Sequence, residues 1–341
     1  MKIFQFIHSI DKGGAETAMF SLHQSFLEKN FESKIITFKD TDIKDKNIIT
    51  LNISKKSPLT PIKLNLFLKK EQPNLILLHL CDLHRLFYKI NYPKIVNVVH
   101  LSLKHKYENK KIYLKHKFFK QIQKTYNKHT TVFVSKYLKD ETIHFFNLSK
   151  DNKYTIYNPF DFEKIKTLAN SYVVEEKNYI LFIGRLEKIK NPLLAIEAFK
   201  YIKNKNISLI FLGEGSLKNN LIKYVKDNNL QHKIKFLGFK RNPYPYIKYA
   251  KVVVSTSYSE VLPSILIESL ILKTPIVSTE NLGAKEIMID ELKIFLTPFE
   301  PKIIASKIES AINNYPSITN KYIKRFNKDI IINKYINLIK G

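Results

Sequence analysis

The chain has 341 residues, of which 44% are hydrophobic; this favours two folded domains over one. Its single cysteine, Cys81, excludes an internal disulfide bond and suits a reducing compartment. The formal net charge of +27 favours a polyanionic partner, either nucleic acid or an anionic membrane surface. Part of that excess reflects an abundance of Lys, Ile and Asn along the whole chain.

The beginning of the chain gives no targeting signal. The apolar stretch within Met1–His8 is too short for a signal peptide. No apolar run approaches the roughly 20 residues that a membrane-spanning helix needs. We therefore expect a cytoplasmic protein.

Short β-rich runs alternate with longer helical patterns in the first half of the chain. The pattern predicts a strand over residues 2–7, followed by a helix over residues 15–28. Further strands are predicted at residues 33–38, 74–79, 94–99 and 130–134. Ser135 is a good N-cap for a helix over residues 135–146. Such alternation indicates a mostly parallel sheet covered by helices.

The same pattern starts again in the second half. Asn191-Pro192 predicts a helix start after a strand at residues 178–183. Further strands are predicted at residues 207–212, 233–237, 251–255 and 274–278, and helices at residues 301–313 and 321–340. We assign an N-terminal domain to residues 1–165, a C-terminal domain to residues 166–318 and a C-terminal helix, of unassigned packing, to residues 319–341.

The segment 259–269 places a carboxylate in an otherwise apolar stretch. From Val261 to Leu272 the only charged side chain is Glu268, and a helix that is apolar on nearly all sides is a buried helix. An unpaired carboxylate there is costly, so Glu268 needs a hydrogen-bonding partner. Glu260 lies just before this helix. Two acidic groups around a helix N-terminus indicate a site for a polyhydroxylated, phosphate-bearing ligand.

Ligands of parallel sheets gather at the carboxyl ends of the strands, and two cations follow such an end. Arg185 and Lys190 lie between the strand at residues 178–183 and the Asn191-Pro192 helix start. Arg offers a planar fork and Lys a compact charge, and both suit phosphate. The pair can hold a diphosphate from two sides. Ordinary surface cations in a Lys-rich chain remain the alternative.

Glycines follow the first strand as well. Gly13 and Gly14 would let the backbone approach a ligand closely, and the helix opening at Ala15 would direct free N–H groups at an anion. A plain turn is an equally good interpretation. Leu262-Pro263 open the apolar helix, whose first N–H groups would face a second phosphate or sugar oxygens.

These motifs together resemble glycosyltransferase family 4 from about residue 1 to about residue 286. The resemblance is carried by Gly13-Gly14-Ala15-Glu16, Ile183-Gly184-Arg185-Leu186 with Lys190, Gly213-Glu214-Gly215, and Glu260 with Glu268. It implies the GT-B fold, in which two doubly wound, Rossmann-like α/β domains face a central cleft. It also implies transfer from a nucleotide-sugar donor with retention of configuration and without a metal or other cofactor.

The resemblance implies roles for particular residues. Arg185 and Lys190 would bind the donor diphosphate and stabilise it as the leaving group. Glu268 would bind the ribose diol, and Glu260 would hold hydroxyls of the donor sugar. His100 would lie near the reacting sugar, although a core or capping histidine is an equally good interpretation.

Other positions complete the implied site. Gly13 and Gly14 would form an acceptor and phosphate loop. The remaining donor-binding candidates are Gly184, Gly213, Arg241, Val261, Leu262 and Pro263. Position 261 departs from the family, whose members usually carry Gly or another small residue there, so the identity of the donor sugar stays open.

Two patterns compete with this interpretation. Asp40-Thr41-Asp42 spells the metal-binding Asp-X-Asp pattern of another glycosyltransferase fold, but its charged surroundings indicate a solvated loop. His79, Cys81, Asp82 and His84 could contribute zinc ligands, which need suitable geometry. His79 ends a predicted strand and the others open a helix, so we expect no metal site.

The segment 104–128 is strongly basic. It holds nine Lys residues, one acidic residue, Glu108, and the aromatic residues Tyr107, Tyr113, Phe118, Phe119 and Tyr126. A basic amphipathic segment with aromatic residues is typical of a membrane-surface element. We expect it to bind anionic lipid at the inner face of the plasma membrane; the solvated face of an ordinary helix is the alternative.

The sequence thus predicts a retaining glycosyltransferase that moves a hexose from a UDP-sugar to a glycan or a lipid-linked acceptor. Biosynthesis of lipopolysaccharide, capsule or another surface glycan is the expected setting. A GT-B nucleotide-sugar epimerase and a basic nucleic-acid-binding protein are alternatives. We expect no nucleic-acid partner, since no helix-turn-helix, zinc-finger or RNA-recognition signature is present.

Overall fold

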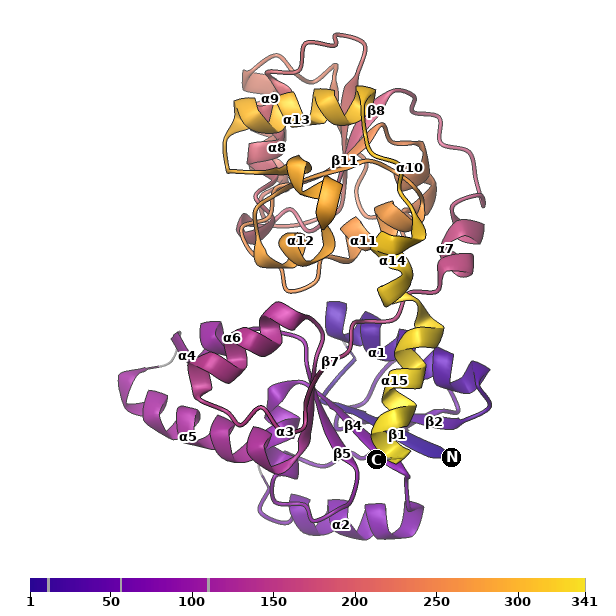
Figure 1. The fold of residues 1–341 in the computed structure, drawn as a ribbon, viewed down its shortest axis with the longest axis vertical. Helices are drawn as coiled ribbons and strands as arrows, with labels where there is room; N and C mark the ends of the chain where they lie inside the picture. Colours follow the sequence, from indigo (N-terminus) through magenta and orange to yellow (C-terminus); the bar gives the residue numbers. More distant parts are fainter. Residues whose placement is uncertain (11–12, 56, 109–110, 341) are drawn as a thin grey trace. The chain divides into compact units, whose positions relative to one another are not determined.

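The computed structural model describes residues 1–10, 13–55, 57–108 and 111–340. The chain forms two compact units (Figure 1). Unit 1 comprises Met1–Phe160 together with Phe326–Gly341, and unit 2 comprises Asp161–Arg325. The first boundary therefore falls after Phe160, and the end of the chain belongs to unit 1.

Unit 1 is built on a seven-stranded sheet in the order β3-β2-β1-β4-β5-β6-β7, with every adjacent pair parallel. Its central strands are buried along their length, as in β4, where all five residues are buried. Near-continuous apolar runs are what a parallel sheet covered on both faces requires. The strands are β1 (Lys2–Ile7), β2 (Glu32–Thr37), β3 (Ile48–Thr50), β4 (Leu75–His79), β5 (Ile95–Val99), β6 (Thr130–Phe133) and β7 (Lys153–Thr155).

One helix of unit 1 begins at the N-cap that the sequence predicts. The predicted N-cap Ser135 is confirmed, because its side chain accepts a hydrogen bond from the backbone N–H of Leu138 at 3.2 Å. The helices are α1 (Gly14–Glu28), α2 (Thr60–Glu71), α3 (Cys81–Phe87), α4 (Leu103–Glu108), α5 (Ile112–Lys128), α6 (Lys136–Phe146) and α15 (Lys328–Lys340).

The C-terminal segment differs from the single helix expected over residues 321–340. It forms α14 (Asn320–Ile323), a 3-10 turn η3 (Lys324–Phe326) and then α15. A backbone bridge between Phe160 and Asn327 interrupts the helix. Helix α15 packs on α1, where Tyr335 is 1% exposed and its ring centroid lies 6.4 Å from that of Phe26.

Unit 2 contains a six-stranded parallel sheet in the order β10-β9-β8-β11-β12-β13. Its strands are β8 (Tyr179–Ile183), β9 (Ser208–Leu212), β10 (Ile234–Phe236), β11 (Val252–Ser255), β12 (Ile276–Thr279) and β13 (Leu296–Thr297). Its helices are α7 (Phe162–Leu168), η1 (Lys188–Lys190), α8 (Pro192–Phe199), α9 (Lys218–Asp227), α10 (Tyr244–Tyr249), α11 (Ser264–Ile271), α12 (Leu282–Ile287), η2 (Asp290–Phe295), α13 (Pro301–Asn313), α14 and η3.

Both sheets have a point at which the strand order reverses. In unit 1 it lies between β1 and β4, and in unit 2 between β8 and β11. Ligands of open α/β sheets bind outside the carboxyl ends of the strands at such a point. The loops after β1, β4, β8 and β11 are therefore the places to look for a site.

Candidate active site

The loops after β8 and β9 are joined through their backbones. The N–H of Gly184 donates to the carbonyl of Leu212 at 3.0 Å, and the N–H of Leu186 donates to that of Glu214 at 2.9 Å. Gly213 has φ +142°, and a Cβ there would lie 2.0 Å from the carbonyl oxygen of Gly184. Only glycine tolerates this approach, so Gly213 shapes the loop that carries the Gly184-Arg185 motif.

Replacing Gly213 by alanine should therefore lower the free energy of unfolding by about 3 kcal/mol or more, since strained backbone and overlap act together. Gly14→Ala is the matched control: nothing lies within 4 Å of a Cβ at that helical position, so it should be neutral or stabilising by less than about 1 kcal/mol. Urea unfolding of both variants checks this prediction. Equal effects would contradict the role assigned to Gly213.

Lys190 and Glu260 meet across the reversal point of unit 2. The ammonium group of Lys190 donates to Oε1 of Glu260, and the two side chains are 24% and 15% exposed. The Cδ atom of Lys190 passes 3.8 Å from the position of a Cβ on Gly184. The structure thus joins the cation predicted after β8 to the acid predicted after β11.

Two residues that the sequence did not single out hold Glu260 in place. The hydroxyl of Ser257 donates to Oε1 of Glu260 at 2.9 Å. The N–H of Gly283 donates to the backbone carbonyl of Glu260 at 3.0 Å, and a Cβ on Gly283 would lie 2.7 Å from that oxygen. The available signal for Gly283 was its position five residues after the predicted strand at residues 274–278, at the same edge of the sheet.

Glu268 lies on the apolar helix α11, as expected, and is half-buried. Within the described ranges, no hydrogen bond or ion pair reaches its carboxylate. Burial raises its pKa from 4.5 to about 7. Burial raises the pKa of Tyr244, and the nearby charge of Glu268 raises it further. A hydrogen-bond donor on a ligand would therefore stabilise the charged form of Glu268.

The other two predicted donor-side cations, Arg185 and Arg241, follow β8 and β10. Arg185 is exposed. Two hydrogen bonds from Ser216 lower the pKa of Glu187, and the charge of Arg185 lowers it further. Arg241 is exposed after β10, and no hydrogen bond or ion pair in the described part of the chain joins it to Lys190 or Glu260.

The start of α11 is a small correction. The helix begins at Ser264, and Pro263 is its buried N-cap rather than part of its first turn. Val261 and Leu262 are half-buried in the turn between Glu260 and the helix. Pro263 has an extended backbone, with ψ of 104°, so the helix does not continue back toward Glu260. Glu260 and Glu268 are therefore not on one continuous helix.

His100 belongs to a buried hydrogen-bonded chain in unit 1. Its Nε2 lies 2.9 Å from Nδ1 of His79, and Nε2 of His79 lies 3.1 Å from Oε1 of Gln5. With the Gln5 oxygen as acceptor, His79 carries its proton on Nε2, and its Nδ1 accepts from His100. Burial lowers the pKa of His100 to about 4 and that of His79 well below its usual value, so both rings are neutral at pH 7.

The hydrogen bonds that join Gln5, His79 and His100 should contribute measurably to the stability of the fold. His79→Leu should lower the free energy of unfolding by about 2 kcal/mol or more, because Gln5 and His100 each lose a buried partner. Adding Gln5→Leu should recover part of that loss, since removing both partners of a buried hydrogen bond is less harmful than removing one. A double-mutant cycle in urea checks the prediction, and strictly additive losses would contradict it.

Gly13 and Gly14 form the start of α1. Gly13 is the extended N-cap, and the helix begins at Gly14. The carboxylate of Glu16 folds back, with Oε2 only 2.5 Å from the position of a Cβ on Gly13. Residues 11–12, which lead into this loop, lie outside the described residues. The loop thus lies after β1, at the reversal point of unit 1.

The alternative metal ligands are engaged otherwise. Nε2 of His84 lies 2.7 Å from the carbonyl of Leu78, and its Nδ1 lies 2.7 Å from the Tyr126 hydroxyl. Across residues 1–10, 13–55, 57–108 and 111–340, no group of three or more His, Cys, Asp or Glu side chains is placed to hold a metal ion. Asp40 and Asp42 lie in an exposed loop.

Three aromatic residues of the basic segment 104–128 pack inside unit 1. Phe118 is 3% exposed, Tyr126 is fully buried, and the ring of Tyr107 packs edge-on against Phe145 at 5.2 Å. Lysines occupy the outer face of α5 instead. In the part of the chain that is described, no helix is long and apolar enough to cross a membrane.

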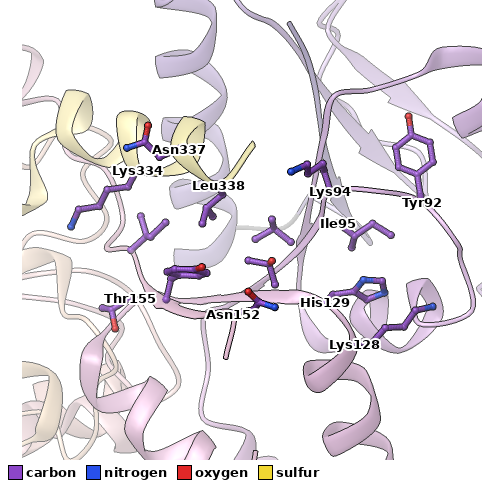
Figure 2. A pocket seen from close by; sticks show the side chains of 14 residues that line it. Tyr92, Lys94, Ile95, Lys128, His129, Asn152, Thr155, Lys334, Asn337 and Leu338 are labelled. Atoms are coloured by element: carbon purple, nitrogen blue, oxygen red, sulfur yellow. The ribbon is translucent and has the colours of Figure 1, made fainter. Parts of the chain in front are cut away.

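A pocket of about 710 Å³ lies on unit 1 where β5, β6 and β7 begin. Figure 2 shows Lys94, His129 and Asn152 from these strand starts, with Lys334 and Leu338 of α15 on the other side. The pocket is thus at the amino edge of the sheet. His100 follows β5 at the opposite, carboxyl edge, so this pocket is not the predicted site.

Two family profiles match consecutive parts of the chain. The profile described as Glycosyltransferase Family 4 matches residues 12–164, and the profile described as Glycosyl transferases group 1 matches residues 164–329. Their junction lies close to the boundary between the two units, at Phe160 and Asp161.

Two transferases of Campylobacter jejuni are similar in sequence. N-acetylgalactosamine-N,N'-diacetylbacillosaminyl-diphospho-undecaprenol 4-alpha-N-acetylgalactosaminyltransferase is 30% identical over 311 residues, covering 85% of this chain and 84% of that protein. A second, the GalNAc-alpha-(1->4)-GalNAc-alpha-(1->3)-diNAcBac-PP-undecaprenol alpha-1,4-N-acetyl-D-galactosaminyltransferase, is 33% identical over 162 residues, covering 46% of this chain and 44% of that protein.

A solved structure has the same fold. The Anabaena protein HepE, crystallised with UDP and glucose, superimposes with a TM-score of 0.79 at 17% identity, covering 100% of both chains. At this identity the likeness concerns the fold alone. The two doubly wound parallel sheets of the GT-B fold, expected from the sequence, are confirmed.

Proposed function

This chain belongs to glycosyltransferase family 4, and we propose that it is a retaining enzyme that moves a hexose from a UDP-sugar to a lipid-linked or glycan acceptor. The membership makes it a glycosyltransferase. The acceptor class, the donor and the stereochemistry are the proposed parts. The setting we propose is the biosynthesis of a surface glycan such as lipopolysaccharide or capsule.

One observation carries the proposal: Lys190 and Glu260 meet at the carboxyl ends of β8 and β11. Glu268, which has no partner among the described residues, lies on the helix that follows. A diphosphate needs cations, and a ribose diol and a sugar need carboxylate acceptors. This edge of unit 2 offers both kinds of group. Carboxylates at this edge would repel the phosphates of a nucleic acid.

The proposed reaction proceeds on one face of the donor sugar. The bond between the anomeric carbon and the phosphate oxygen breaks as the acceptor oxygen bonds to the same carbon, and the departing phosphate oxygen takes the acceptor proton. Arg185 and Lys190 stabilise the charge that develops on the diphosphate, and Glu260 holds the sugar in position. These cations make a metal unnecessary, so activity should persist in EDTA.

The relatives support the donor and acceptor classes. HepE was crystallised with UDP and glucose. The first Campylobacter relative is named for a diphospho-undecaprenol acceptor and an alpha linkage. Transfer from an α-linked sugar nucleotide to an α-linked product retains the configuration. We therefore propose a UDP-hexose as donor and a membrane-borne acceptor for this chain.

A thermal-shift panel of UDP-, GDP- and ADP-hexoses, followed by product analysis with a polyprenyl-diphosphate glycan, tests the function. We expect stabilisation by UDP-sugars and one α-linked product. A donor whose free concentration is 100 times its dissociation constant adds about 2.7 kcal/mol to the free energy of unfolding. No shift with any nucleotide would overturn the proposal, and an epimerised free sugar nucleotide would replace it by the epimerase alternative.

A membrane-borne acceptor fits a cytoplasmic protein that binds the bilayer from its surface, and α5 offers the charge for this. Lys117, Lys120 and Lys124 are exposed along one face of α5, and each Lys near an anionic surface contributes about 1 kcal/mol. Changing all three to Gln should therefore weaken binding to phosphatidylglycerol vesicles by about 100-fold. Co-sedimentation at low and high salt measures it.

The control removes the same charge from unit 2, through Lys205, Lys223 and Lys226, which are exposed. This control should sediment with the vesicles like the unmodified protein. Binding that ignores anionic lipid and salt would contradict the membrane proposal while leaving the transferase proposal intact.

A further inference from the structure

A second group of cations lies in unit 1, apart from Arg185 and Lys190. Three of them converge on Asp82, which opens α3 after β4. Nζ of Lys106 lies 3.2 Å from Oδ1 of Asp82, Nζ of Lys55 lies 3.9 Å from Oδ2, and Nη2 of Arg85 lies 4.0 Å from Oδ1. Lys106 also donates to Sγ of Cys81 at 3.0 Å. We call Lys55, Asp82, Arg85 and Lys106 the Asp82 cluster.

The fold explains why these residues meet. Lys55 follows β3, Asp82 and Arg85 follow β4, and Lys106 follows β5. All three strands are parallel members of one sheet, so their carboxyl ends lie at the same edge. Ligands of such sheets bind at this edge. His79 ends β4, and its ring contacts His100. Asp82 lies only three residues after His79 along the chain.

The cluster has more positive charge than its single acid balances. Burial lowers the pKa of Lys55, and the neighbouring charges of Lys106, Lys39 and Arg85 lower it further against the opposing effect of Asp82. Nε of Arg85 is buried and has no hydrogen-bond partner in the described residues. The side chains of Lys55, Arg85 and Lys106 are 23%, 32% and 42% exposed, so a ligand can reach them.

The geometry points to a binding site for the diphosphate of the acceptor, with Lys55, Arg85 and Lys106 as its ligands. This inference rests on the proposed function and adds the feature by which the acceptor is recognised. One Arg and two Lys around a small anion are the donors that suit phosphate oxygens. Asp82 holds the three cations together and competes with the ligand for them. The site differs from the donor diphosphate site, which lies in unit 2.

Geranyl diphosphate, which carries a diphosphate but no sugar or nucleoside, is the probe. Isothermal titration of the full chain should show binding that weakens about tenfold for Arg85→Gln, and again for Lys106→Gln, as each charge-assisted contact is lost. The control Lys63→Gln with Lys69→Gln, two exposed positions on α2, should bind like the unmodified protein. Asp82→Asn should bind several-fold more tightly, which a merely unfolded variant would not do.

Two comparisons separate this site from other sources of phosphate. Arg185→Gln with Lys190→Gln should still bind geranyl diphosphate, whereas loss of binding there alone would place the probe in the donor site and overturn the inference. Arg85→Gln with Lys106→Gln should still sediment with phosphatidylglycerol vesicles, and loss of sedimentation would reassign the cluster to lipid headgroups. Absence of binding to the unmodified protein also overturns it. UDP binding, measured in parallel, reports separately on the proposed function.

Discussion

Replacing Lys190 by alanine should lower the turnover number by about 10²- to 10³-fold, the usual effect of removing one preorganised group that stabilises charge in a transition state. The ammonium group of Lys190 donates to Glu260, and the methylene chain of Lys190 runs beside Gly184. An ammonium group has three donors, so two remain for a diphosphate. The loss should appear mainly in the turnover number, because negative charge on the leaving group grows as the sugar bond breaks.

Lys188→Ala is the matched control, since it removes the same charge from the same 3-10 turn, η1. Lys188 is exposed, so Lys188→Ala should keep the turnover number of the unmodified protein. The release of UDP during transfer measures the turnover of both variants. Lys190→Ala should lower the free energy of unfolding by only about 1 kcal/mol, because Glu260 keeps the hydroxyl of Ser257 and some contact with water. Full activity in Lys190→Ala would contradict the assignment of the leaving-group site to this edge.

Much of this fold could be predicted because its strands are continuous apolar runs between polar loops. The strand predicted over residues 2–7 is β1, with the same bounds, and the helix predicted over residues 301–313 is α13. The strands β3, β7 and β13 were missed. They have only three, three and two residues, which is too short for a periodic pattern to show.

Contacts between distant segments were the part that local patterns do not encode. The pairing of Phe160 with Asn327 ends a helix whose periodicity runs on to residue 340. In the basic segment, periodicity showed two faces of α5 but could not show that α6 covers the aromatic one. There the rings of Phe119 and Phe146 approach to 5.3 Å.

The Lys190 and Glu260 pair was accessible from the sequence, because both follow strands that a parallel sheet brings to one edge. Ser257 and Tyr244 were not. Ser257 lies in the loop after β11 and Tyr244 at the start of α10, and the directions of side chains at such positions have no period in a single sequence. The Asp82 cluster was missed because its residues come from segments after three separate strands, and no local pattern shows that their side chains meet.

Glu268 gives the second large effect, and it has two signs. Glu268→Gln should lower kcat/KM for the donor by about 100-fold, because a neutral amide accepts weaker hydrogen bonds from two ribose hydroxyls than a carboxylate does. The same change should stabilise the ligand-free protein near neutral pH, because burial raises the pKa of Glu268 to about 7 and the charge is unpaired there.

The direction with pH follows from proton binding. Between the unfolded pKa of 4.5 and the folded pKa of about 7, the folded protein holds a proton that the unfolded chain has released. Its stability therefore falls as pH rises through this window, by at most about 3 kcal/mol, and is constant above it. Glu268→Gln lacks this loss, so its advantage over the unmodified protein in urea unfolding should grow from pH 5 to pH 8.

Donor binding should reverse the effect of burial. Ribose hydroxyls that donate to Glu268 favour its charged form, so its pKa falls and the protein releases protons when UDP binds near pH 7. Calorimetry of UDP binding in two buffers of different ionisation enthalpy measures this release, which Glu268→Gln should abolish. A variant that releases as many protons as the unmodified protein, with the same stability profile, would show that the acid on α11 does not meet the nucleotide.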